Sequence, residues 1–126
     1  MDLPAPTDAE YEILRVLWDR GPATVREIHD VIARAKPVGY TTVLKQMQVM
    51  HTKGLLKRSE RFRSHVYEAV QKQTQVQRQL TAAILQQVFD GSARELLQSA
   101  LAGRKVPARE LEEIRALLSE YERRSK

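Results

Sequence analysis

The stretch GYTTVLKQMQVMHTKGLL, residues 39–56, has the apolar spacing of a helix with one buried side. Val43, Met47 and Met50 fall at i, i+4 and i+7, and this stripe predicts a helix starting near Thr41. Gly54 follows as the residue type that commonly ends helices. The opposite side carries outward-pointing residues, namely Thr41, Thr42, Lys45, Gln48 and Val49. This side is too polar for a core helix, so it predicts a surface that meets a partner.

Two helices are predicted before this stretch, each opened by a capping box. The boxes are TDAE at residues 7–10 and TVRE at residues 24–27. Gly21-Pro22 ends the first helix, and Pro37 with Gly39 ends the second. The apolar stripes comprise Ile13, Leu14, Leu17 and Trp18 in the first helix, and Val25, Ile28 and Ile32 in the second. We expect these stripes to share one core with the stripe of the third helix.

A β-hairpin is predicted after the third helix. Residues 55–60 and 65–70 have the composition of two strands, and the basic segment Arg61-Phe62-Arg63-Ser64 joins them. Three helices and a hairpin with a basic tip form the winged helix-turn-helix pattern. The expected fold is therefore mainly α with a small β-hairpin, and residues 1–70 are the expected winged helix-turn-helix DNA-binding domain.

Charge is distributed unevenly along this domain. Residues 1–30 hold seven acidic and three basic residues, whereas residues 41–67 hold six basic residues and one acidic residue. The whole chain of 126 residues has a net charge of +5. An acidic start followed by a basic middle suggests one face that meets a polyanion. The alternative is an ordinary solvated surface.

On the winged-helix interpretation, the third helix enters the DNA major groove and the hairpin tip reaches the adjacent backbone. The predicted DNA-binding residues are Tyr40, Thr41, Thr42, Lys45, Gln46, Arg61 and Arg63. The threonines would contact phosphate or the methyl group of a thymine, and the Tyr40 hydroxyl and the two arginines would contact the phosphate backbone. Lys45 would reach a guanine edge or a phosphate, and Gln46 would reach a base edge. The alternatives are helix capping for the threonines, packing for Tyr40 and a solvated face for the charged residues.

Other classes of function have little support in the sequence. The chain has no cysteine, and its histidines (His29, His51 and His65) are scattered, so we expect neither a metal nor another cofactor. Neither a Gly-rich phosphate loop nor a nucleophile setting is visible, so we do not expect an enzyme. Neither a secretory signal nor an apolar run long enough to insert into a membrane is visible, and we expect a cytoplasmic protein.

The second half of the chain, residues 71–126, is expected to be a helical dimerisation domain. Its apolar stripes lie at residues 76–89, 96–101 and 111–121, with Asp90-Gly91 and Gly103 as breaks between them. A winged helix closes its own core, so surplus amphipathic helices suggest self-association. The predicted dimerisation residues are Leu80, Ile84, Val88, Leu97, Leu101, Leu111, Ile114 and Leu118. The alternative is that these helices fold back on the first domain.

The motifs of the three helices, the hairpin and the helical tail resemble those of the penicillinase repressor family. This family comprises the BlaI/MecI repressors, and the copper-responsive CopY repressors are their relatives. The similar segments are TDAEYEILRVLWDRGPATVREIHDVI, GYTTVLKQMQVMHTKGLLKR and RFRSHVYEAV, and the likeness covers nearly the whole chain. The resemblance implies a homodimeric repressor on inverted-repeat operators in double-stranded DNA, often controlling β-lactamase or related resistance or stress genes. In well-known members, a membrane-bound sensor protease causes cleavage in the dimerisation region and releases the DNA.

This chain departs from the family pattern in three places. Ser99-Ala100 stands where those members have the cleaved Asn–Phe pair, so any cleavage position here carries a different sequence. The absence of cysteine excludes the copper sensor of the CopY branch. Leu44, Lys45 and Val49 stand where the family commonly has more threonine and an arginine, which predicts a different operator.

Two further hypotheses stay open. A winged helix can serve as a protein-interaction module without sequence-specific DNA binding, with the helical tail as its docking surface. A ligand-responsive regulator, with an effector between the winged domain and the tail, is the weaker alternative because no polar pocket pattern is visible.

Overall fold

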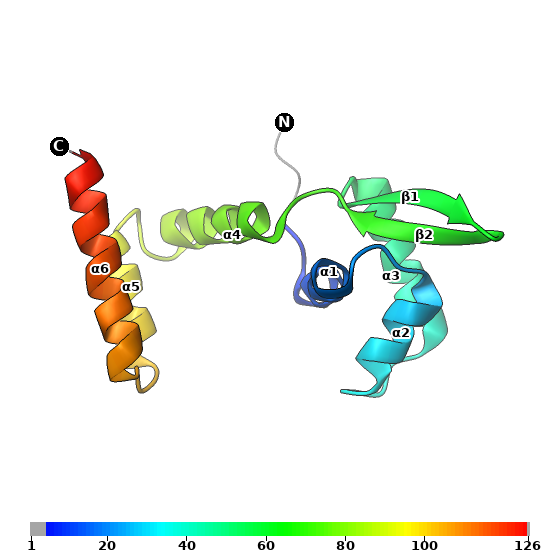
Figure 1. Cartoon of the computed structure of the whole chain (residues 1–126), viewed down its shortest axis with the longest axis horizontal. Helices are drawn as coiled ribbons and strands as arrows, with labels where there is room; N and C mark the ends of the chain where they lie inside the picture. Colours follow the sequence, from blue (N-terminus) through cyan, green and yellow to red (C-terminus); the bar gives the residue numbers. More distant parts are fainter. Residues whose placement is uncertain (1–4, 126) are drawn as a thin grey trace. The chain divides into compact units, whose positions relative to one another are not determined.

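The computed structural model describes residues 5–125. The elements follow in the order α1 (Asp8–Arg20), α2 (Val25–Ala33), α3 (Tyr40–Lys53), β1 (Leu56–Arg61), β2 (Ser64–Ala69), α4 (Gln73–Gln87), α5 (Ala93–Ala102) and α6 (Ala108–Ser125) (Figure 1). The predicted class, mainly α with a small hairpin, is confirmed. The chain divides within α4 into two compact units, the first reaching Ala82 and the second starting at Ala83. The functional boundary expected after residue 70 stays a prediction.

Capping boxes start the first two helices, as predicted. The Thr7 hydroxyl accepts the Glu10 N–H at 3.2 Å, and the Glu10 carboxylate accepts the Thr7 N–H at 2.9 Å. Thr24 and Glu27 repeat the arrangement at 3.2 and 2.9 Å. Each box satisfies two backbone donors that the first helical turn leaves without partners, and this fixes where α1 and α2 begin.

Helix α3 is seated on the core by the stripe that the sequence predicts. The side chains of Val43, Met47 and Met50 are fully buried. The helix begins at Tyr40, with Gly39 as an N-cap that makes no side-chain hydrogen bond. Gly54 ends it with φ +90°, in the left-handed region that glycine adopts without steric cost.

The core of the first unit joins all three helices to the base of the hairpin. Its buried members are Ile13, Leu14, Leu17, Ala23, Val25, Ile28, Ile32, Val43, Met47, Met50, Leu55, Leu56 and Tyr67. Trp18 packs against this cluster, and its indole N–H donates to the Gln71 carbonyl at 2.9 Å. Ala23 pairs with Tyr67 through hydrogen bonds of 3.0 and 2.8 Å, which ties the connection between α1 and α2 to the hairpin base.

The hairpin turn is shorter than the predicted segment 61–64. Arg61 pairs with Ser64, so the turn consists of Phe62 and Arg63 alone. Both residues are in the left-handed region, with φ of 50° and 64°, as a two-residue turn between right-twisted strands requires. The hairpin projects past the helices of the first unit (Figure 1).

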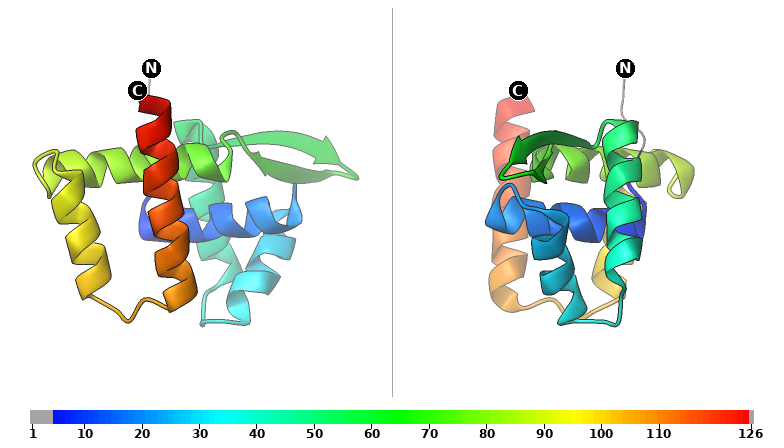
Figure 2. Two further views of the ribbon diagram at one scale, coloured as in Figure 1. Left: turned by 60° about the vertical axis from the view of Figure 1, so that its left-hand side comes forward. Right: turned by 90° about the vertical axis from the view of Figure 1, so that its right-hand side faces the viewer.

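The second unit has no closed core of its own. Helices α5 and α6 run in opposite directions and are joined by residues 103–107 (Figure 2). No described residue between 83 and 125 is buried. Helix α4 ends at Gln87, so the predicted helical segment 76–89 is two residues too long, and Val88 lies in a turn.

Candidate nucleic-acid interface

The outward face of α3 presents most of the predicted residues to solvent. Tyr40, Thr41, Thr42 and Lys45 are exposed, and Gln46 is half-buried on the flank of the helix. Since Gly39 provides no side-chain cap, the threonines and the free N–H groups of the first turn stay available to an external acceptor. The alternative that these threonines cap the helix is therefore wrong.

Tyr40 both packs and remains accessible. Its ring meets the His29 ring edge-on, with centroids 5.9 Å apart, and the Arg26 guanidinium lies 5.6 Å from its centroid. His29 in turn donates from Nε2 to the Val38 carbonyl at 2.8 Å. Tyr40 nevertheless keeps 40% of its surface exposed. These contacts hold the first turn of α3 and the preceding connection against α2.

The Tyr40 contacts bring one more arginine, Arg26, to the candidate interface; it was not among the predicted residues. Arg26 is exposed and lies in the first turn of α2, between the two partners of the capping box, Thr24 and Glu27. A positive charge in the first turn of a helix interacts unfavourably with the helix dipole. This unfavourable position is the sequence signal that could have indicated Arg26.

One hollow joins α3 to the hairpin. It has a volume of about 410 Å³, and its lining includes Arg26, Tyr40, Arg63 and His65. Tyr40 and Arg63 were predicted from segments on either side of β1, and the fold brings them to the same hollow. The polar and basic lining suits an anionic strand better than an apolar ligand.

The other flank of α3 gathers three predicted residues. Thr42, Lys45 and Gln46 line a smaller depression together with Val49 and Glu10. Burial raises the pKa of Glu10, but hydrogen bonds from Lys53 and Thr7 outweigh this and hold the pKa below its ordinary value. The Glu10 carboxylate pairs with Lys53 at 2.8 Å, which offsets its negative charge beside Lys45.

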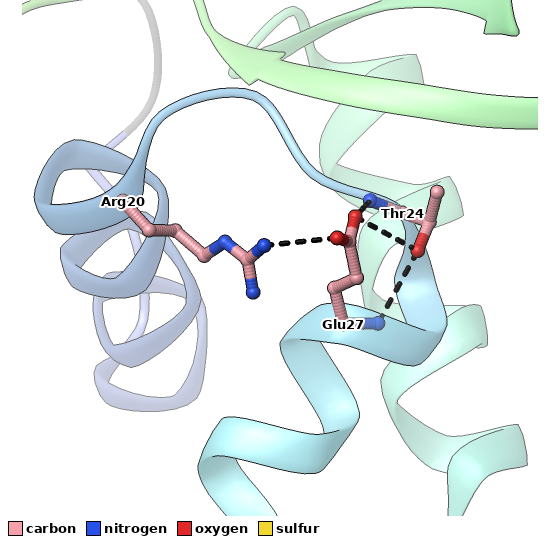
Figure 3. A network of polar contacts seen from close by, with 3 residues as sticks. All are labelled: Arg20, Thr24 and Glu27. Atoms are coloured by element: carbon pink, nitrogen blue, oxygen red, sulfur yellow. Dashed lines mark hydrogen bonds and ion pairs between the residues drawn. The ribbon is translucent and has the colours of Figure 1, made fainter.

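A polar network braces the start of α2 (Figure 3). The Arg20 guanidinium donates to the Glu27 carboxylate at 2.9 Å, and the same carboxylate accepts the Thr24 backbone N–H at 2.9 Å. The Thr24 backbone hydrogen bond is the main cause that lowers the pKa of Glu27, and the charges of Arg20 and Arg61 contribute. The network ties α1 to α2.

Three predicted bases have no ion-pair partner among residues 5–125: Lys45, Arg61 and Arg63. Lys57, a basic residue on the hairpin, differs because its Nζ lies 3.5 Å from the Glu68 carboxylate. An exposed basic side chain without a carboxylate partner keeps its charge available for a phosphate, so these three residues are the strongest candidates for phosphate contacts in the predicted set.

The predicted dimerisation residues leave much apolar surface uncovered. Ile84, Val88 and Leu118 are 46%, 67% and 50% exposed. The half-buried members are Leu80, Leu97, Leu101, Leu111 and Ile114, of which Leu80 belongs to the first unit. The predicted set omitted Leu117 and Tyr121, which are 66% and 65% exposed on α6.

Ser99 and Ala100, the candidate cleavage position, are exposed within α5. Among the described residues, no helix is both long and apolar enough to cross a membrane. Residues 5–125 also contain no group of three or more His, Asp or Glu side chains that could hold a metal ion.

Three helices, a projecting basic hairpin and a brace between α2 and α3 define a winged helix-turn-helix protein. The family model described as penicillinase repressor matches residues 6–120, and the chain belongs to this family.

Similar proteins agree with this assignment. The transcriptional regulator BlaI of Mycobacterium tuberculosis (strain CDC 1551 / Oshkosh) is 30% identical over 118 residues, covering 91% of this chain and 83% of that protein. A penicillinase repressor of Staphylococcus aureus is 19% identical over 116 residues, covering 92% of both chains. The solution structure of the DNA-binding domain of the repressor BlaI superposes with a TM-score of 0.52 at 20% identity, covering 58% of this chain and 89% of that one. That likeness supports the winged-helix fold.

Proposed function

We propose that this protein is a sequence-specific DNA-binding transcriptional repressor that acts as a homodimer on inverted-repeat operators. The observation that carries the proposal is the arrangement of the first unit: the outward face of α3 and the bases Lys45, Arg61 and Arg63 are exposed and have no carboxylate partners among residues 5–125. The transcriptional regulators among its relatives support the same conclusion.

Each part of the interface has a distinct role in this proposal. Thr41 and Thr42 contact phosphate or a thymine methyl group at the start of α3, where free N–H groups favour anions. One turn further on, Lys45 reaches a phosphate or a guanine edge, and Gln46 reaches a base edge. Tyr40, Arg61 and Arg63 hold the phosphate backbone, which positions the helix but carries no sequence information by itself.

Dimerisation rests on the apolar surface of residues 71–126. Ile84, Val88 and Leu118 are about half exposed or more, and burying these side chains against a second copy would stabilise the dimer. A two-fold dimer presents two copies of α3, and each reads one half of an inverted repeat. Residues 1–70 thus bind DNA in this proposal, and residues 71–126 form the dimer.

The regulated genes in this proposal are β-lactamase-type resistance or stress genes, as in the family. Relief would come from a membrane-bound sensor protease that acts within the dimerisation domain at Ser99-Ala100. Since this bond lies inside α5, cleavage requires local opening of the helix. Purified protein with the cleaved bond should run as separate fragments and lose operator affinity.

Charge reversal tests the DNA-binding proposal. A variant with Lys45, Arg61 and Arg63 changed to Glu should lose operator binding in a gel-shift titration and remain dimeric in light scattering. The matched control reverses the exposed basic residues Arg78, Lys105 and Arg109, which changes the net charge by the same amount away from the DNA interface, and light scattering checks that this control also remains dimeric. Equal DNA affinity of the two variants would contradict the proposal. It would favour a protein-interaction module, for which the exposed tail is the docking surface.

A further inference from the structure

The tip of the hairpin carries an aromatic side chain that the DNA-binding proposal does not yet use. Phe62 is 93% exposed, the highest value among the exposed large apolar side chains. It stands between Arg61 and Arg63 at the far end of β1, a strand in which only Leu56 is buried. The ring therefore projects into solvent on a basic arm.

The backbone at the tip makes this choice of residue costly. Phe62 and Arg63 have φ of 50° and 64°. A turn of this type favours Asn-Gly, because side chains with a Cβ atom other than Asn or Asp are disfavoured in the left-handed region. Neither exposure nor turn propensity favours a phenylalanine here, and such departures are typical of functional positions.

The dimensions of the arm indicate where the ring goes. Strands of six residues extend about 20 Å at the usual rise per residue. Half a helical turn of B-DNA, the step from the groove that holds α3 to its neighbouring groove, is about 17 Å. The hairpin is thus long enough to bring its tip to the minor groove beside the major groove occupied by α3.

We propose that Phe62 enters this minor groove and packs on the deoxyribose rings of its walls, while Arg61 and Arg63 pair with the phosphates on the two sides. Apolar side chains are a recurring means of contacting the minor groove. The inference rests on the proposed DNA-binding function and adds an apolar contact that salt does not weaken, in contrast to the arginine contacts.

The substitution Phe62→Asn separates a DNA contact from a structural role. Asparagine suits the left-handed turn better, so the thermal midpoint should stay the same or rise. The probe is the duplex that the parent protein recovers from a random library. We expect Kd for this duplex to rise about tenfold, as for loss of a partly buried aromatic contact. The slope of log K against log salt should stay unchanged, and Phe62→Tyr should restore binding to within about twofold of the parent.

Hydroxyl-radical footprinting reports on the sugars directly. The parent should protect deoxyriboses in the minor groove flanking each half-site, and Phe62→Asn should lose that protection while the major-groove contacts of α3 persist. Parent-like affinity and footprint for Phe62→Asn would overturn the inference and leave the DNA-binding function standing. A lower thermal midpoint, or a changed oligomeric state without DNA, would instead show that Phe62 stabilises the fold or joins two copies. A parent that recovers no duplex would overturn both proposals together.

Discussion

The salt dependence of DNA binding can be worked out from the charges of the interface. Four exposed basic residues of α2, α3 and the outer end of the hairpin (residues 61–64) have no carboxylate partner within residues 5–125: Arg26, Lys45, Arg61 and Arg63. A dimer would therefore place about eight basic side chains on phosphates, and each contact contributes about −0.9 to the slope of log K against log salt. We expect a slope of about −7 and an affinity loss of about 10⁴-fold between roughly 50 and 200 mM salt.

The variant Arg63→Gln tests this reasoning one contact at a time. It removes one phosphate contact per protomer, so the slope for the dimer should become shallower by about 1.8. The control is Lys57→Gln on the same hairpin, because Lys57 already pairs with Glu68 and should change the slope by less than half as much. Fluorescence anisotropy over a salt series gives both slopes. A parent slope shallower than about −3, or equal slopes for the two variants, would refute the assignment of these bases to phosphates.

Three further outcomes follow from the packing and the ion pairs. Met47→Ala removes a fully buried side chain and should lower the free energy of unfolding by about 2–5 kcal/mol in urea titrations; a loss below about 1 kcal/mol would contradict its place in the core. The pKa of Glu10 is lowered in the folded protein, so the ionised carboxylate stabilises the fold above the ordinary pKa of 4.5, and this stabilisation is lost as pH falls through the folded pKa. Glu10→Gln keeps the capping box and should flatten this loss of stability at acid pH. An unchanged acid transition in the variant would exclude Glu10 as its source. Leu118→Asp on the half-exposed face of α6 should shift the dimer toward monomer in sedimentation experiments without changing the winged domain's spectrum, whereas an unaltered dimer would move the interface elsewhere.

Local chemistry made the first unit largely predictable. The capping boxes at Thr7 and Thr24 and the stripe around Met47 depend on spacing within single helices, and the structure confirms them. The turn at Phe62 was placed too broadly, because two residues without turn propensity occupy left-handed backbone there. Sequence propensity gives no sign of a turn whose residues are disfavoured in left-handed backbone.

Contacts between distant segments account for what the sequence did not predict. The pairing of Lys53 with Glu10 spans 43 positions, and no local pattern reports it. Arg26 joins the interface because Tyr40 lies beneath it, which depends on how α2 packs on α3. The assignment of individual bases to DNA contacts remains a prediction, since it depends on a partner.

Selection of bound duplexes from a random DNA library tests the central claim most directly. The account predicts recovery of an inverted repeat whose half-sites are about one helical turn apart, bound by one dimer and lost when Lys45, Arg61 and Arg63 are reversed in charge. Recovery of unrelated sequences with no shared half-site, at affinities equal to competitor DNA, would contradict it.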